Sequence, residues 1–340
     1  MWIIIPEILE IFNIKPDSFC YCWSNKKYWD CCMKVAHEPR LTKDEFNKMN
    51  PNNYNWIIPP TIHKDNVFNL IKECLLCNNE ASKSHTISNN WMRKTFNSDF
   101  VSTALPDKYG NMVLTKISIN QASAIPIWCN YHDNKVFDPI DDSIDLKNIH
   151  HLNLLAYRAL WREYKLLISH LKSCYTIVYY LRESEFQRRL AEIYKRSIET
   201  FWLTKFVENL VMSENDKWLT HKIFRLGKIE PIFLSSAIHI EREKYWIEEK
   251  HVVTLSIIML NNVWYFILSY KSDQKAPQNL YRIIKQNEEK NNLIPFLNDF
   301  IWKNCENIIC DESRAWELIQ TRADWKMYEN WAHDYIRLLN

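Results

Sequence analysis

Residues 252–270 read VVTLSIIMLNNVWYFILSY, two runs rich in β-branched and aromatic residues that are separated by a pair of asparagines. Residues of these types favour extended strands, and Asn261-Asn262 can adopt the positive φ angles that a tight hairpin turn requires. The segment therefore predicts an antiparallel hairpin with strands over 252–260 and 263–270. A further strand is expected over 231–240, where apolar and polar residues partly alternate.

Helical patterns lie on both sides of this β-rich segment. Apolar residues recur at helical spacing across 152–171 and across about 183–212, and the chain returns to a helical pattern from 279, broken near Asp311. Helices combined with antiparallel strands predict the α+β class. We expect a helical segment over 146–215 and a C-terminal α+β domain over 220–340.

Composition excludes several classes of protein. The chain has 340 residues, 47% hydrophobic and 25% charged, with a net charge of +2, so its overall charge gives no electrostatic case for nucleic-acid binding. It has only two glycines, Gly110 and Gly227. A P-loop or a Rossmann phosphate turn needs several glycines close together, so nucleotide-binding enzymes of these types are not expected.

The sequence also shows no pattern typical of a membrane-spanning segment. No stretch reaches the roughly 18 uninterrupted apolar residues that a membrane helix needs, and the apolar start is short and ends before Glu7. We therefore expect a cytoplasmic protein with no membrane partner. In that reducing compartment, closely spaced cysteines favour metal binding over disulfides.

The first of two cysteine clusters lies within residues 1–45. Cys20, Cys22, Cys31 and Cys32 form a C-x-C-x8-C-C array, whose four thiolates can satisfy one tetrahedral Zn²⁺. A segment this short would take its folding energy from the metal.

This array resembles the SEC-C zinc motif, which is found at the end of the translocase motor SecA. The typical pattern of the motif is C-P-C-G-S-G-K-K-Y-K-x-C-C, or the same pattern ending in C-H. The ligands, Ser24 and the run Lys26-Lys27-Tyr28 occupy matching positions, whereas Trp23 and Asn25 replace glycines. The resemblance implies a small module that binds proteins or nucleic acid and performs no chemistry.

The second cluster lies within residues 61–145. Cys74 and Cys77 form one pair of ligands, and Cys129 and His132 form another. Two pairs at i and i+3 can each wrap one side of a zinc ion, which predicts a second structural Zn²⁺ in a Cys₃His site. His85 lies eight residues beyond Cys77, and two interpretations of its role are open: a zinc ligand in place of one of the four, or a core histidine bonded to backbone.

The second cluster resembles the treble-clef zinc module of the HNH, or ββα-metal, nucleases. In that family a C-x2-C pair precedes a strand that carries a general-base histidine. A later pair opens a helix whose next residue helps to hold a catalytic metal. The resemblance implies His85 as the base and Asp133 at the metal-holding position, with Mg²⁺ or Mn²⁺ as the catalytic ion. Two departures stand out: Ser84 replaces the usual acidic residue or histidine, and residues 124–128 lack the usual middle asparagine.

Two functions therefore follow from the sequence. The first is a metal-dependent, HNH-like nuclease that acts on nucleic acid. Its expected role is in bacterial defence against phage. The alternative is a non-catalytic zinc scaffold that binds nucleic acid or a protein partner.

Overall fold

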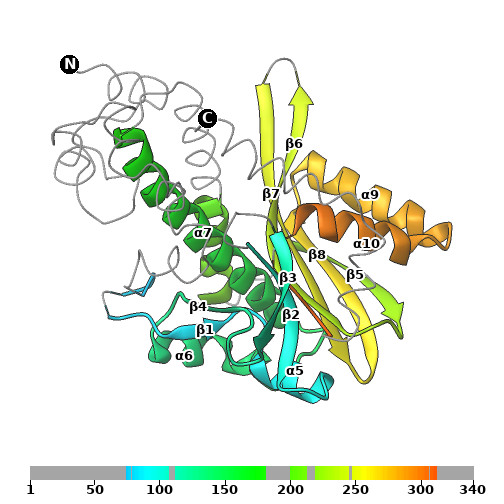
Figure 1. The fold of residues 1–340 in the computed structure, drawn as a ribbon. Coiled ribbons are helices and arrows are strands. Elements are labelled where there is room, and N and C mark those ends of the chain that lie inside the picture. The colour runs from blue at the N-terminus through cyan, green and yellow to red at the C-terminus, as the bar shows by residue number, and fades with distance from the viewer. Residues whose placement is uncertain are drawn as a thin grey trace.

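A computed structural model of the chain describes residues 74–77, 79–106, 112–180, 200–212, 219–244, 247–305 and 307–311. Its centre is a seven-stranded antiparallel sheet with helices on both faces, as Figure 1 shows. The SEC-C-like array of Cys20, Cys22, Cys31 and Cys32 lies outside the described residues. Where residues are described, helices and antiparallel strands together confirm the α+β class.

The sheet has the strand order β3-β2-β9-β6-β7-β8-β5, and every neighbouring pair is antiparallel. Its strands are β2 (Phe100–Pro106), β3 (Met112–Ser118), β5 (Leu219–Gly227), β6 (Ile232–Lys244), β7 (Ile247–Leu260), β8 (Val263–Lys271) and β9 (Ile308–Cys310).

The hairpin predicted at 252–270 is confirmed as β7 and β8. Leu260 pairs with Val263 across the turn, and Asn261 and Asn262 have φ angles of 51° and 59°. Two successive positive φ values match the right-handed twist of the flanking strands. Side chains of β8 then alternate between the two faces: Phe266 joins one apolar core and Ile267 the other.

One helical layer covers each face of the sheet. Helix α7 (Ile149–Tyr180) and a helical run over 200–212 pack on the face that includes Ile267, which confirms the helix expected over 152–171. Helices α9 (Lys275–Glu289) and α10 (Leu293–Asn304) pack on the opposite face with Phe266. Asn291, with a φ of 55°, follows the end of α9, as residues in left-handed caps often do.

A partly buried polar contact ties α7 to the sheet. His221 of β5 has its Nε2 atom 3.0 Å from Asn153 Oδ1 on α7 and its Nδ1 atom 2.8 Å from Ser269 Oγ on β8. An amide oxygen can only accept, so Nε2 donates to Asn153 and the Ser269 hydroxyl donates to Nδ1. Burial lowers the pKa of His221 to about 4.

A second, smaller unit lies beside α7 in Figure 1. It contains β1 (Lys83–His85), β4 (Ala124–Pro126) and α6 (Asn130–Asp141), with β1 and β4 paired antiparallel. Between these two strands the chain forms α5 (Asn89–Thr95), β2 and β3, and β2 pairs with β9 in the large sheet. Strands from residues 100–118 and from residues 219–310 therefore share one sheet.

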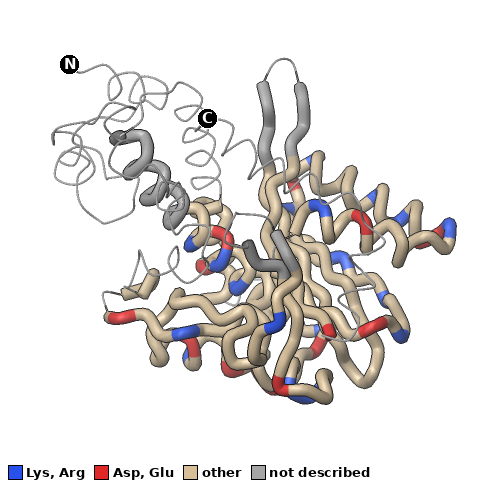
Figure 2. The backbone as a smooth tube through the Cα atoms, viewed as in Figure 1, with Lys and Arg blue, Asp and Glu red and all other residues tan. Residues whose placement is uncertain are grey.

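Aromatic packing joins α6 to α7. The Trp128 and Phe137 rings lie 4.6 Å apart between centroids, and Phe137 lies 6.0 Å from Tyr157 of α7. Basic and acidic residues are interspersed along the described backbone in Figure 2. Among the described helices, none has both the length and the apolar character that crossing a membrane requires.

Candidate metal centre

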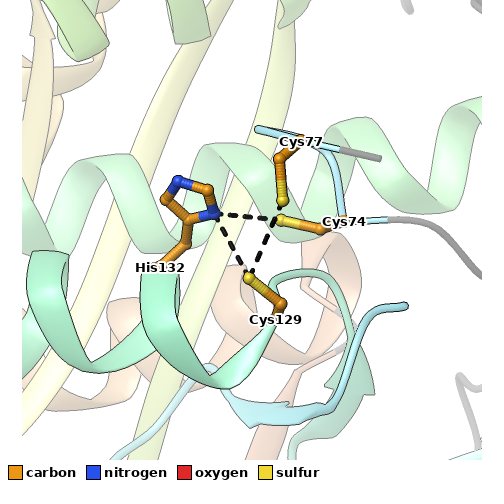
Figure 3. Close-up of side chains that lie close together, drawn as sticks. All are labelled: Cys74, Cys77, Cys129 and His132. Carbon is orange, nitrogen blue, oxygen red and sulfur yellow. Dashed lines mark hydrogen bonds between the residues drawn. The ribbon is translucent and has the colours of Figure 1, made fainter. Parts of the chain in front are cut away.

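Four side chains converge where the start of α6 meets the turn at residues 74–77, as Figure 3 shows. They are Cys74, Cys77, Cys129 and His132, and their ligand atoms all lie within 4.8 Å of one another. Cys77 Sγ is 3.8 Å from Cys129 Sγ. His132 Nδ1 is 3.5 Å from Cys74 Sγ and 3.3 Å from Cys129 Sγ. The structure thus brings together all four residues of the predicted second site.

These spacings fit the edges of a tetrahedral zinc site. Zinc bonds of about 2.3 Å to sulfur and about 2.1 Å to nitrogen, at tetrahedral angles, place ligand sulfurs about 3.8 Å apart and sulfur and nitrogen about 3.6 Å apart. The observed 3.8 Å between the two sulfurs matches, and the sulfur–nitrogen distances of 3.3 and 3.5 Å lie close to expectation. The cluster can therefore hold a metal ion, with His132 coordinating through Nδ1.

Local backbone geometry explains why these residues meet. The Cys77 N–H donates to the Cys74 carbonyl at 3.3 Å, which closes the first turn and directs both thiols to one side. Cys129 is the extended N-cap of α6, and its carbonyl accepts the first helical hydrogen bond from the Asp133 N–H. The Leu75 N–H donates to the Ile127 carbonyl and holds the turn against the segment that leads into α6.

Backbone amides also point at the sulfurs. The His132 N–H lowers the pKa of the Cys129 thiol. The Asn79 N–H acts in the same direction on Cys77, but burial and the neighbouring thiols raise the pKa of Cys77 overall. Protons on such a cluster must leave when a metal binds, because thiolates are the ligands.

His85 lies at the end of β1, and its Nδ1 atom is 3.0 Å from the Ala122 carbonyl. A carbonyl can only accept, so Nδ1 carries the hydrogen and Nε2 is the basic nitrogen of the neutral ring. Ser123, the residue after Ala122, is buried and has a φ of 53°, an unfavourable value for a residue with a side chain. Its hydroxyl accepts from the Ile87 N–H, which fixes this turn beside His85.

Asp133 is in a different environment from His85. Burial raises the pKa of Asp133 to about 6; the Asp141 carboxylate acts in the same direction, and the positive charge of Arg158 opposes it. Ser84 lies near enough to lower the pKa of Asp133, but its hydroxyl is outside hydrogen-bond geometry. Asp133 Oδ1 has no hydrogen-bond partner among the described residues.

Arg158 of α7 is the residue of this region that the sequence does not reveal. Its side chain is 2% exposed, lies 4.2 Å above the Phe137 ring and donates from Nη2 to Asp141 Oδ1 at 2.7 Å. In the sequence it is one of four basic residues of a long helix, with Arg162, Lys165 and Lys172. The one available signal was its position on the buried side of the predicted helix, between Leu155 and Leu160.

No protein-family model matches the chain, and no curated protein and no solved structure matches it. Function is therefore inferred from the geometry of the site.

Proposed function

We propose that this protein binds a structural Zn²⁺ through Cys74, Cys77, Cys129 and His132 and acts as a non-catalytic zinc scaffold. The observation that supports it is the convergence of the four ligand atoms within 4.8 Å, with three of the six distances at 3.3–3.8 Å, close to the edges of a tetrahedral site. Four protein ligands leave no open position for water or substrate, as is typical of structural zinc. The ion would join the 74–77 turn to α6 in the order of a treble clef: turn, antiparallel strand pair, helix.

The surroundings of Asp133 favour a scaffold over a nuclease. A catalytic Mg²⁺ keeps several waters and must contact a substrate phosphate, so it needs an accessible carboxylate. Asp133 is half-buried with its Oδ1 atom out of contact with solvent, Ser84 is fully buried, and the charge of Arg158 acts on the same carboxyl. A second cation at this position would be repelled by the guanidinium.

The partner of the scaffold would be nucleic acid or another protein. The SEC-C-like array at Cys20, Cys22, Cys31 and Cys32 remains a prediction of a second zinc and of a second binding module. Lysine and arginine residues are interspersed with acidic ones on the described backbone (Figure 2), so binding of nucleic acid would depend on local contacts.

Metal analysis of the full chain tests the zinc site. We expect the Cys129→Ser variant to contain about one zinc equivalent less than wild type, whatever the SEC-C-like array contributes. Cys305→Ser is the matched control, because it removes another buried thiol that lies outside the cluster. Equal zinc in wild type and in Cys129→Ser would refute the proposed site.

An HNH-like nuclease is the second candidate, and the geometry of His85 favours it. The Ala122 carbonyl holds the ring with Nε2 as the basic nitrogen, which is the state that a general base needs. Purified protein with plasmid DNA or RNA and Mg²⁺ or Mn²⁺ would distinguish the two functions. If the protein is a scaffold, no cleavage is expected. Cleavage by wild type that is lost in His85→Ala would refute the scaffold proposal and support the nuclease.

A further inference from the structure

Two thiols of the metal centre lie close together but differ in exposure. Cys77 Sγ and Cys129 Sγ are 3.8 Å apart, although the two residues are 52 positions apart in the chain. Cys74 and Cys129 expose only 4% and 7% of their surface, whereas Cys77 is half-buried. A small oxidant that enters from solvent would therefore reach Cys77 first.

We propose that this centre is a redox switch, in which a hydroperoxide oxidises Cys77 and Cys129 to a disulfide and releases the metal. The inference rests on the proposed zinc site. Three thiolates and one neutral imidazole around Zn²⁺ leave a net charge of −1, so the sulfurs keep more nucleophilic character than in a neutral site with two thiolates.

The chemistry takes place in two steps. The Cys77 thiolate attacks one peroxide oxygen, the O–O bond breaks, and the leaving oxygen takes a proton and departs as water or an alcohol. Cys77 is then a sulfenic acid. The Cys129 thiolate attacks its sulfur, the S–S bond forms, and the hydroxyl leaves with a second proton as water. The peroxide gains the two electrons that the two sulfurs lose.

Loss of the metal follows from the number of ligands that remain. Only Cys74 and His132 would still have a free thiolate and imidazole, and two ligands are too few for a structural zinc site. The new disulfide would join the same two segments that the ion had joined, the 74–77 turn and the start of α6. It closes the loop that contains β1, α5, β2, β3 and β4, so the fold is retained while the surface around Cys74 and His132 changes.

The experiment begins with the zinc content of the reduced full-length protein, so that absence of zinc tests the proposed site separately. Hydrogen peroxide is then added in steps, zinc release is followed with a chromophoric chelator, and disulfides are mapped by non-reducing peptide mass spectrometry. We expect one zinc equivalent to leave in step with a Cys77–Cys129 disulfide, and dithiothreitol with added zinc to restore the site. Buried Cys310, whose pKa is raised to about 12, is the internal control and should remain unmodified.

A thermal measurement on the wild-type protein supplies a second readout. The oxidised, zinc-free protein should melt at a higher temperature than reduced protein stripped of zinc by a chelator, because the disulfide keeps the cross-link.

Two variants serve as controls for the peroxide experiment. In Cys77→Ser the disulfide should not form, whereas in Cys305→Ser it should form as in wild type. Failure to lose one zinc equivalent after peroxide, or a disulfide that joins other cysteines in place of this pair, would overturn the switch and leave the zinc site itself intact.

Discussion

Acidification is expected to weaken the fold through His221, which ties β5 and β8 to α7. Burial lowers the pKa of this imidazole from 6.5 to about 4. The unfolded chain therefore takes up a proton at a higher pH than the folded protein does. The contribution of His221 to stability is complete above pH 6.5 and is lost as the pH falls from 6.5 toward 4.

The size of the loss follows from the two pKa values. At about pH 5.5 the imidazole is protonated in roughly ten of eleven unfolded molecules and in few folded ones, a difference of about 1.4 kcal/mol in the free energy of unfolding. Over the whole interval from 6.5 to about 4, the loss reaches about 3 kcal/mol.

Urea unfolding of wild type and His221→Gln, each in excess zinc at about pH 7.5 and about pH 5.5, isolates this effect. The glutamine amide can donate to Asn153 and accept from Ser269, but it does not titrate. All other titrating groups are shared, so their effects cancel in the difference. Wild type should lose about 1.4 kcal/mol more than the variant on acidification. Equal losses in the two proteins would show that His221 is not held neutral by the fold.

Three further outcomes are expected. Chelation of the metal should speed amide hydrogen exchange in the β1–β4 pair while amides of the β7–β8 hairpin keep their protection; equal loss in both regions would contradict a local role for the ion. Asp141→Asn should lower the free energy of unfolding by about 2 kcal/mol or more, because it removes the negative charge that lies 2.7 Å from the buried Arg158 guanidinium. Arg158→Met should lower the free energy of unfolding by less than Asp141→Asn does, since Asp141 is 37% exposed and can be solvated. A larger loss for Arg158→Met than for Asp141→Asn in denaturant titrations would refute this account. Asn307→Ala should destabilise by about 1–3 kcal/mol, because the Asn307 amide donates to Thr86 and to the Ser235 carbonyl in the interior, whereas exposed Asn304→Ala is the control and should change little.

Elements with a strong local pattern could be predicted from the sequence. The hairpin at 252–270 needed only its two β-rich runs and Asn261-Asn262, and helix α7 needed only its apolar periodicity. The grouping of Cys74, Cys77, Cys129 and His132 was predicted from spacing alone, and these four residues are close enough to hold a metal ion. Local signals were sufficient in these cases because neighbours in the chain determine the turn, the helix face or the ligand pair.

Other features depend on contacts between distant segments. Strands β1, β4 and β9 have three residues each, too few to show a period, and they exist because a partner strand pairs with them. The surroundings of Asp133 depend on Arg158, which comes from another helix. Asn307 contacts Thr86 across 221 positions, and nothing in either local sequence indicates this pairing.

The position of β9 in the sheet has a consequence for how the protein is made. Strand β9 lies between β2 and β6, and Ser102 contacts Cys310 from 208 positions away. A ribosome that adds roughly 5–20 residues per second needs roughly 10–40 s to cover that distance. Throughout that interval β2 has its partner β3 on one side and an open edge on the other. The nascent chain therefore carries an exposed strand edge during much of its synthesis, and this is the stage at which a holding chaperone would be needed.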